Sequence, residues 1–401
     1  MIGTANGGNT FPGATLPYGM IAWSPTSTRG DQTSTGAANG YEYGATRMRG
    51  LSLTHVNGAG CNPGAAGDVP IMPFVGDITS SPSADSKDAV YAADFSHDNE
   101  RAVPGRYSVG LDSGATADLA VSKRAGVADF GFPAGKPANL LFRVSNSLNG
   151  SEDAEVKIDT AHRKVTGSVL TGAFCGRRAN GGTNNRKSYY RLYFSASFDR
   201  DFASTGTWKD GTLAPGATTG SGGEGTPPAR TGRAGVRRLG GLRHCGRRRR
   251  PDADRDLLRQ PGRRRGQPPR GGAAGHERGR CGPRRVPAWD RELNSARVGG
   301  GSTAQRTTFY TALYHSLMQP NLISDTDGRY PGMDGAPHRV KRGRERSTAT
   351  SPAGTSTVPR SSYWRCSNPR SPVISPSPCT TSRARTTGCG TAGCTSTGPP
   401  T

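Results

Sequence analysis

The feature that most constrains this sequence is the uneven distribution of its charge. The 401 residues include 53 Lys or Arg and 30 Asp or Glu, a net charge of +23. Residues 226–285 hold 19 Arg and 4 acidic residues, and residues 341–401 hold 9 basic residues and 1 acidic residue. These two basic windows carry the whole excess, so residues 1–225 and 286–340 are neutral overall. A chain of ordinary composition is therefore interrupted by two segments of a different chemical kind.

Neither basic window has the pattern of a folded domain. Residues 226–285 contain no Phe, Tyr or Trp, and no strand or helix period runs through them. Residues 341–401 are rich in Ser, Thr, Arg, Pro and Gly, a composition that buries too little apolar surface to fold. We expect both windows to be disordered or non-native. A nucleic-acid arm is the alternative, since clustered Arg neutralises phosphates. Because the first window offers no aromatic side chain for base stacking, we expect no specific nucleic-acid partner.

The neutral part before the first window predicts a mainly β fold. Its short candidate strands are separated by Gly, Asn, Asp and Ser clusters, which is typical of a β-sandwich. Alternation places five apolar side chains of the last strand on one face: Tyr190, Leu192, Phe194, Ala196 and Phe198. The candidate strands are Arg106–Leu111, Asp118–Ser122, Asn139–Asn146, Glu155–Ile158, Lys164–Leu170 and Tyr189–Phe198.

The neutral part between the windows predicts two helices, at Pro287–Val298 and Ser302–Met318. Ser302 and Gln305 have the spacing of a capping box, and Pro320 follows the second helix. Its apolar stripe, Phe309, Leu313 and Leu317, is expected in a core or a domain interface. Farther on, Asp325, Asp327 and Gly328 resemble part of a calcium loop. The pattern lacks its closing Glu, so we expect a turn.

One glycine-rich stretch, Arg49–Pro73, has the composition of a binding loop. An alternating run with Leu51 and Leu53 predicts a strand, and Val69–Phe74 predicts a second one. Between them lie polar side chains and glycines, which let a backbone approach a ligand closely. A wide surface turn is the alternative. The residues of interest are Thr54, His55, Asn57, Gly58, Gly60, Cys61, Gly64, Gly67 and Asp68.

Several stretches resemble, in order along the chain, glycoside hydrolase family 92, whose members are exo-acting α-mannosidases. They are GNTFPGA (8–14), LPYGM (16–20), WSP (23–25), GYEY (40–43), RGLSLTHVNGAGC (49–61), GDVPIMP (67–73) and RTTFYTALYHSLMQPN (306–321). The resemblance implies an N-terminal β-sandwich, a helical linker and an (α/α)₆ catalytic barrel. It also implies inverting hydrolysis of terminal α-mannose by two carboxylates, assisted by a calcium ion.

With this resemblance, the glycine-rich stretch becomes a candidate sugar-binding loop. A neutral histidine and backbone amides suit the recognition of hydroxyl groups, and Phe11 offers an aromatic face. Two alternatives remain: His55 is a buried loop histidine bonded to backbone, and Phe11 is a core side chain. Asp68 is expected to anchor the loop. The candidate substrate-binding residues are Phe11, Thr54, His55, Gly58, Gly60 and Cys61.

The basic windows fit a shift of reading frame. GC-rich codons for Arg255–Arg270, read from the second base, can spell AISYVSLAGAEANLR, a strand, a turn and the start of a helix. Codons for Thr350–Pro369, read from the third base, can spell FSGWDLYRSQVQLLALLEP, which resembles the family's Trp-Asp motif and first barrel helix. We interpret both windows as shifted-frame translation of family sequence.

The sequence thus predicts four parts: a sandwich domain at 1–225, an Arg/Gly-rich segment at 226–285, a helical linker at 286–340 and a Ser/Thr/Pro/Arg-rich tail at 341–401. The nominal function is hydrolysis of terminal α-mannose from glycans. We expect the chain to be inactive, because the barrel with its carboxylates and calcium ligands is absent. A non-catalytic carbohydrate-binding sandwich is the alternative. No apolar stretch is long enough to span a membrane. The family implies export, although no signal peptide is evident and the true start is expected upstream.

Overall fold

We describe the fold from a computed structural model. The described residues are 1–5, 7–27, 39–58, 66–83, 88–148, 151–171, 190–222, 286–331 and 336–340, with four short strands at 236–238, 242–244, 347–351 and 354–358. The chain divides into a unit of residues 1–367 and a second unit of residues 368–401, which lies outside the described residues. Apart from the four short strands, the expectation of disordered or non-native basic windows also falls outside them.

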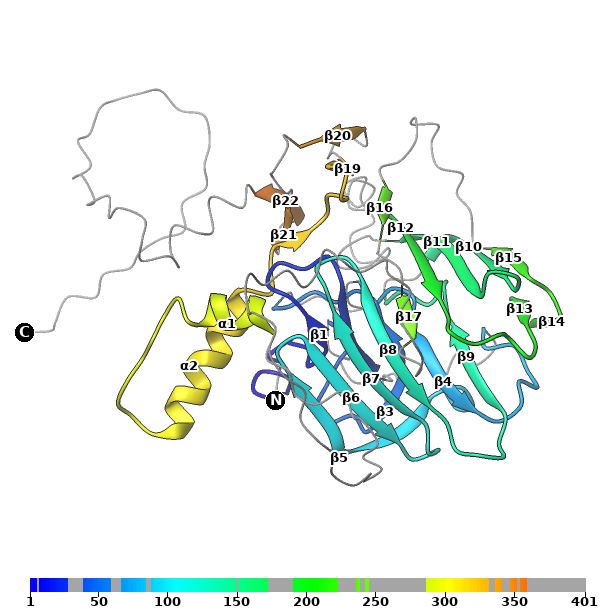
Figure 1. Ribbon diagram of the computed structural model, residues 1–401, viewed down its shortest axis with the longest axis horizontal. Coiled ribbons are helices and arrows are strands. Elements are labelled where there is room, and N and C mark those ends of the chain that lie inside the picture. Colours follow the sequence, from blue (N-terminus) through cyan, green and yellow to red (C-terminus); the bar gives the residue numbers. More distant parts are fainter. Residues whose placement is uncertain are drawn as a thin grey trace, which may run out of the picture. The chain divides into compact units, whose positions relative to one another are not determined.

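The described part is mainly β, as the sequence predicts, and it forms a sandwich (Figure 1). One sheet contains β1 (Ala14–Thr15), β2 (Ala22–Ser27), β3 (Arg47–Ser52), β4 (Ile71–Val75) and β9 (Ala138–Phe142). The other begins with β5 (Ala93–Val103), β6 (Arg106–Leu111), β7 (Thr116–Val121) and β8 (Gly126–Gly131). It continues through β17 (Leu242–His244) to β12 (Tyr190–Ser197), β11 (Lys164–Thr171), β10 (Ser151–Asp159) and β15 (Thr219–Gly222).

The long strand β5 joins the two sheets. Its first residues, Ala93 and Asp94, pair with β3, and its later residues pair with β6 after a register shift between Phe95 and Glu100. Such an irregularity bends a strand and increases its twist, which lets one strand serve both layers. The neighbours β5 to β8 are antiparallel and lie side by side in Figure 1.

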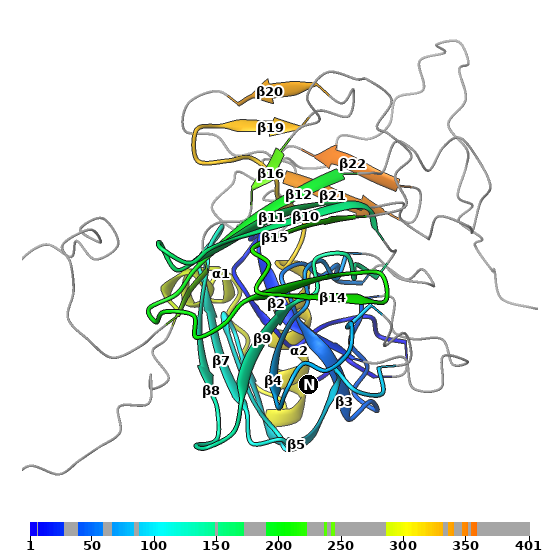
Figure 2. The ribbon, with the colours of Figure 1, turned by 90° about the vertical axis from the view of Figure 1, so that its right-hand side faces the viewer.

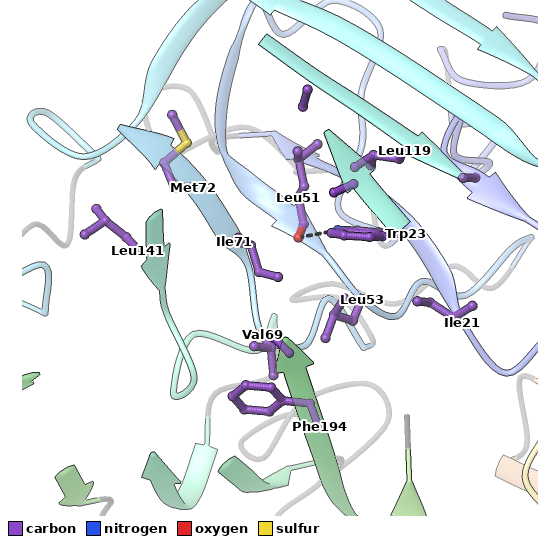
Figure 3. Packing of buried hydrophobic residues seen from close by; sticks show 14 of the residues in the cluster. Ile21, Trp23, Leu51, Leu53, Val69, Ile71, Met72, Leu119, Leu141 and Phe194 are labelled. Atoms are coloured by element: carbon purple, nitrogen blue, oxygen red, sulfur yellow. Dashed lines mark hydrogen bonds between the residues drawn. The ribbon is translucent and has the colours of Figure 1, made fainter. Parts of the chain in front are cut away.

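The main core lies between the sheets and is built by alternation. On β6, Tyr107, Val109 and Leu111 are buried while the residues between them are half-exposed. On β12, Leu192, Phe194 and Ala196 are buried, with Tyr190 and Phe198 packed against the same cluster. The predicted apolar face of this strand is therefore confirmed. Figure 3 shows the centre of the core, where the buried indole of Trp23 donates to the carbonyl of Leu51 at 3.1 Å.

Six strands predicted from sequence alternation are present, with ends that differ by a few residues. Arg106–Leu111 matches β6 without change. Two differences are largest. At Asn139–Asn146, β9 ends at Phe142 and a turn follows, with the amide of Asn146 donating to the carbonyl of Arg143. At Glu155–Ile158, β10 begins earlier, at Ser151. Strand β5 and the hairpin of β13 (Gly206–Lys209) and β14 (Thr212–Pro215) were not predicted. Their exposed polar residues conceal the two-residue period.

Two helices follow the first window: α1 (Pro287–Leu293) and α2 (Thr303–Ser316). The capping box of Ser302 and Gln305 is confirmed by both of its hydrogen bonds. The predicted burial of the α2 stripe is wrong for Phe309, which is 39% exposed, whereas Leu317 is buried. The reason is that only the C-terminal end of α2 packs on the sandwich. There a second core cluster gathers Phe11, Tyr18, Ala22, Tyr41, Trp289, Leu317 and Met318.

The remaining strands are short: β16 (Val236–Arg238), β18 (Asn321–Leu322), β19 (Arg329–Pro331), β20 (Pro337–Arg339), β21 (Ser347–Ser351) and β22 (Gly354–Val358). Figure 2, turned by 90° from Figure 1, shows β10, β11 and β12 side by side, and β4 beside β9.

None of the helices in the described part of the chain is long and apolar enough to cross a membrane.

Candidate functional site

The glycine-rich stretch connects two paired strands, as predicted. Leu51 on β3 lies opposite Ile71 on β4. Two main-chain hydrogen bonds extend this pairing into the loop: the amide of Leu53 donates to the carbonyl of Asp68, and the amide of Gly67 donates to the carbonyl of Thr54, both at 2.9 Å. The loop therefore has a narrow, fixed neck. The candidate residues Gly60 and Cys61 lie outside the described residues.

Asp68 ties this neck to the opposite sheet. One carboxylate oxygen, Oδ2, accepts from the hydroxyls of Thr54 at 2.6 Å and Tyr190 at 2.7 Å. The amide of Asp68 in turn donates to the Thr54 hydroxyl at 3.0 Å. Asp68 and Thr54 are buried, and Oδ1 of Asp68 has no hydrogen-bond partner among the residues that the structure describes. A buried carboxylate is costly unless it is hydrogen-bonded, so the two hydroxyl bonds hold strands β12 and β4 and the loop together.

His55 lies under the loop and not on its surface. Its Nδ1 is 3.0 Å from the carbonyl of Ala22, and its Nε2 is 3.5 Å from the hydroxyl of Thr26. The carbonyl can only accept, so Nδ1 carries the proton and Nε2 is the acceptor. Burial lowers the pKa of His55 to about 4, which keeps the imidazole neutral near pH 7. The ring of Phe11 packs against it, with centroids 5.1 Å apart. Both side chains are almost fully buried.

The tip of the described loop meets the end of α2. The side-chain amide of Asn57 donates to the carbonyl of His315 at 3.0 Å, and the amide of Gly58 donates to the carbonyl of Asn9 at 2.8 Å. Gly58 is exposed and has a φ of +72°, a conformation that glycine adopts without strain. Burial and the positive N-terminus of the chain lower the pKa of His315. The tip is thus placed where the sandwich and the helical segment meet.

A second polar cluster surrounds the buried carboxylate of Glu100. Its oxygens accept from the hydroxyls of Tyr41 at 3.0 Å and Tyr107 at 2.7 Å, and Nδ1 of His97 lies 2.6 Å away. Nε2 of His97 faces the carbonyl of Tyr43 at 2.5 Å. Burial, together with the charge of Glu100, raises the pKa values of Tyr41 and Tyr107, so both phenols stay protonated as donors. This cluster fixes the 40–43 motif against β5 and β6.

The predicted turn at Asp325–Gly328 is present. The amide of Gly328 donates to the carbonyl of Asp325 at 3.0 Å, and the carboxylate of Asp327 accepts from the amide and guanidinium of Arg329. These bonds lower the pKa of Asp327. No three His, Cys, Asp or Glu side chains converge as potential metal ligands within the described part of the chain.

Several residues that shape this site were not predicted from the sequence. Tyr190 and Asn57 belong to predicted segments, but their partners lie 122 and 258 residues away, a distance that no local pattern spans. Glu100 was missed because β5 shows no alternation. The family-like motifs were the signal that could have located these contacts. Asn9, Asn57 and His315, which meet at the loop tip, lie in the motifs at 8–14, 49–61 and 306–321.

Comparison with known proteins decides the family. Residues 1–237 match the model of the glycosyl hydrolase family 92 N-terminal domain, and residues 283–350 match the model of the glycosyl hydrolase family 92 catalytic domain. The chain belongs to glycosyl hydrolase family 92. The motif-bearing residues described above all fall within these two matches.

Individual relatives agree with this family but are much longer. An uncharacterized secreted glycosidase of Arthroderma benhamiae is 28% identical over 181 residues, which are 42% of this chain and 22% of that protein. A family GH92 α-mannosidase from Bacteroides thetaiotaomicron has a similar structure, with a TM-score of 0.59 and 21% identity over 86% of this chain and 44% of its own. An inverting GH92 mannosidase from the same organism gives 0.55 and 21% over 85% and 41%. The chain therefore spans less than half of each relative, and the structural likeness concerns the fold.

Proposed function

We propose that this chain supplies the sandwich domain and the following helical segment of a glycoside hydrolase that removes terminal α-linked mannose from glycans or glycoproteins. The observation that carries the proposal is the family match, which covers residues 1–237 and resumes at residues 283–350. The solved GH92 relatives are described as mannosidases, one of them as inverting, and both share this fold. Mannose-containing glycans are accordingly the proposed partner, with no specific nucleic acid.

Within this function, the loop after β3 is proposed to contact the sugar. The exposed tip at Gly58 would approach the sugar with its backbone, while its amide stays bonded to the carbonyl of Asn9. Gly60 and Cys61 remain in the proposed set and lie outside the described residues. The buried members of the candidate set then act by positioning. Thr54 and Asp68 fix the neck, while His55 and Phe11 fill the space beneath the tip. This arrangement keeps the sugar-binding proposal and accounts for the burial of these four side chains.

The described residues do not fit the calcium ion that the family implies. Both carboxylate oxygens of Asp327 are used by Arg329, and Asp325 accepts from the amide of Thr326. Calcium takes six to eight oxygen ligands, which this turn does not offer. We therefore derive no step through calcium and place the ion's ligands outside these residues.

We further propose that the 401-residue chain, assayed alone, hydrolyses no mannoside. The support is that the catalytic-domain match covers only residues 283–350 and ends inside the second basic window, which begins at residue 341. Purified chain would be incubated with an aryl α-mannoside or mannobiose plus calcium, next to an intact family 92 mannosidase. We expect no release of mannose above the buffer blank. Turnover by the chain that is lost on chelation would contradict the proposal.

A non-catalytic carbohydrate-binding role is the second candidate, favoured by an exposed loop tip on a fixed neck. Mannose and mannobiose would be titrated while tryptophan fluorescence is recorded. If the loop binds sugar, Asn57→Ala should weaken binding, because it releases the tip from α2, whereas Ser113→Ala on the distant β6–β7 turn should not. Equal binding by both variants would remove the loop from the proposal. Export from the cell is proposed as well, since the curated relative is described as secreted.

A further inference from the structure

Two residues of β5, His97 and Glu100, form a polar pair that the proposed function does not use. Nδ1 of His97 lies 2.6 Å from the carboxylate of Glu100, and Nε2 lies 2.5 Å from the main-chain carbonyl of Tyr43. The Glu100 side chain is fully buried, whereas the His97 side chain is 20% exposed. The imidazole therefore bridges a buried carboxylate to the segment 40–43 and still reaches water, with which it exchanges protons.

The two contacts require a proton on each side of the imidazole ring. A main-chain carbonyl only accepts hydrogen bonds, so Nε2 of His97 donates to Tyr43. A second proton must lie between Nδ1 and the Glu100 carboxylate, because two lone pairs 2.6 Å apart would repel each other. Whether this proton sits on the nitrogen or on the oxygen, the pair holds one proton more than a neutral imidazole beside an ionised carboxylate.

The phenols around the pair keep their own protons. Tyr41 and Tyr107 donate to the Glu100 carboxylate at 3.0 Å and 2.7 Å. Burial and the charge of Glu100 raise the pKa values of both phenols, so neither loses its proton near neutral pH. Histidine, by contrast, ordinarily changes charge between about pH 5 and 8. The proton that leaves this cluster first is therefore the one shared by His97 and Glu100.

Other charged or titratable groups face the pair from three neighbouring segments. The ring of Tyr43 stacks on the imidazole with centroids 4.0 Å apart, and Glu42 adds a negative charge near the phenols. Met1, which carries the α-amino group, approaches the hydroxyl of Tyr41 with its sulfur at 3.5 Å. Arg47 of β3 is engaged by a carboxylate at the start of β5. An aromatic face and a nearby negative charge are surroundings that suit a cationic imidazole.

Loss of one proton leaves the ring unable to make both contacts. A neutral imidazole has one N–H donor and one lone pair. If Nδ1 keeps the proton, the lone pair of Nε2 faces the Tyr43 carbonyl, and if Nε2 keeps it, the lone pair of Nδ1 faces the Glu100 carboxylate. Hydrogen bonds to an ionised carboxylate are the stronger ones, so the contact to Tyr43 is the one that breaks.

The segment that would be released borders the neck of the glycine-rich loop. The amide of Tyr43 donates to the carbonyl of Thr4 at 2.8 Å. The side chain of Leu148 packs against both the segment and the neck: a β-carbon at Gly40 would lie 2.9 Å from it, and one at Gly67 would lie 2.5 Å from it. The bond between His97 and Tyr43 thus helps to hold a segment whose backbone is closely packed beside the loop.

We propose that His97 is a pH-dependent latch on residues 40–45. With a proton at each ring nitrogen, it bridges Glu100 to the carbonyl of Tyr43. When the pH rises and one proton leaves to the solvent, the carbonyl is released and residues 42–45 loosen. The latch is closed in mildly acidic solution and open above neutral pH. The inference does not depend on mannosidase activity.

Hydrogen exchange of the intact 401-residue chain, read by mass spectrometry, tests the latch. Intrinsic exchange rates at each pH are divided by the observed rates, so that only protection is compared. We expect protection at residues 42–45 to fall about tenfold between about pH 5 and 8, because one charge-assisted hydrogen bond is lost. Residues 190–197 should keep their protection. This direction is opposite to the effect of His55, whose protonation destabilises the fold at low pH.

Three variants separate the latch from a general effect of pH. In Glu100→Gln the amide donates to Nδ1, so a neutral imidazole makes both contacts and the fall in protection should shrink below about twofold. His97→Gln, which has no titrating group, should shrink it likewise. His162→Gln is the matched control, because His162 pairs with Asp159 three residues away but is exposed, and it should leave the tenfold fall intact.

The unmodified chain alone can contradict the latch, so the test does not depend on the folding of the variants. Protection at residues 42–45 that stays constant from about pH 5 to 8 would overturn the proposal. An undiminished fall in folded His97→Gln would overturn it as well.

Discussion

The two ends of the sandwich differ in how completely the core is filled. At one end, Trp23 of β2 is wholly buried, bonds to the carbonyl of Leu51 on β3 and packs against Phe130 of β8. At the other, Phe142 is only half-buried and lines an open pocket of about 1820 Å³. The pocket is lined in part by Gly220, Ser221 and Gly222 of β15, the last strand before the first basic window. The difference shows that packing is tighter around Trp23 than beside β15, the last strand before the first basic window.

The largest expected effect is a contrast between two truncations. Trp23→Ala removes a fully packed indole and leaves the carbonyl of Leu51 without its donor, so we expect a loss of about 4 kcal/mol in the free energy of unfolding. Phe142→Ala only enlarges an existing pocket, so we expect it to lose less than about 2 kcal/mol. Urea unfolding measures both. Equal losses would show that the two ends are packed alike.

The free energy of unfolding should also depend on pH, through the buried His55 near the end that contains Trp23. Its folded pKa of about 4 lies below the usual 6.5, so between these values the unfolded chain binds more protons. The contribution of a neutral His55 is therefore complete above pH 6.5 and is lost as the pH falls towards 4. It amounts to about 3 kcal/mol. His55→Asn should flatten the fall in unfolding free energy between pH 7 and pH 4. An unchanged slope in this variant would refute the assignment.

Loss of the hydrogen bond between Tyr190 and Asp68, which joins the two sheets, should reduce the free energy of unfolding by a smaller amount. Tyr190→Phe deletes one hydroxyl donor to the buried carboxylate of Asp68, and we expect a cost of about 2 kcal/mol because the acceptor is charged. Hydrogen exchange should become faster at residues 54–58, since Asp68 holds the loop neck. Tyr193→Phe, on the same strand, is the control. Exchange that is unaltered by Tyr190→Phe would mean that the neck does not depend on this bond.

The smallest effect is expected at the start of α2, which lies away from both ends of the sandwich. Ser302→Ala removes one half of the capping box and should cost about 1 kcal/mol. Because no side chain within Thr303–Ser316 is fully buried, the change should appear as faster hydrogen exchange in the first turn. A loss of several kcal/mol on global unfolding would instead show that α2 is part of the main core.

The sequence was sufficient for elements with strict alternation or clear caps. Tyr189–Phe198 and the Ser302 capping box are examples, because a two-residue period and a cap are local properties. It was insufficient for β5, where residues such as His97 and Glu100 face a polar cluster and break the period. It also overestimated the burial of Phe309, since an apolar stripe does not reveal how much of a helix finds a partner.

The candidate site was located by its composition, but its contacts were not. Glycines and polar residues between two strands indicated a loop at 54–68, and both flanking strands are present. The sequence did not reveal that His55 would be bonded beneath the loop to Ala22, or that Tyr190 would reach Asp68 from the opposite sheet. Those contacts result from the packing of the two sheets, which brings together residues far apart in the chain.

The most direct test of the account is the nucleotide sequence that encodes residues 226–285 and 341–401. The account predicts that the second-base frame of the first window and the third-base frame of the second contain no stop codons. It also predicts that they encode AISYVSLAGAEANLR and FSGWDLYRSQVQLLALLEP. Stop codons in these frames, or codons that spell unrelated peptides, would contradict it.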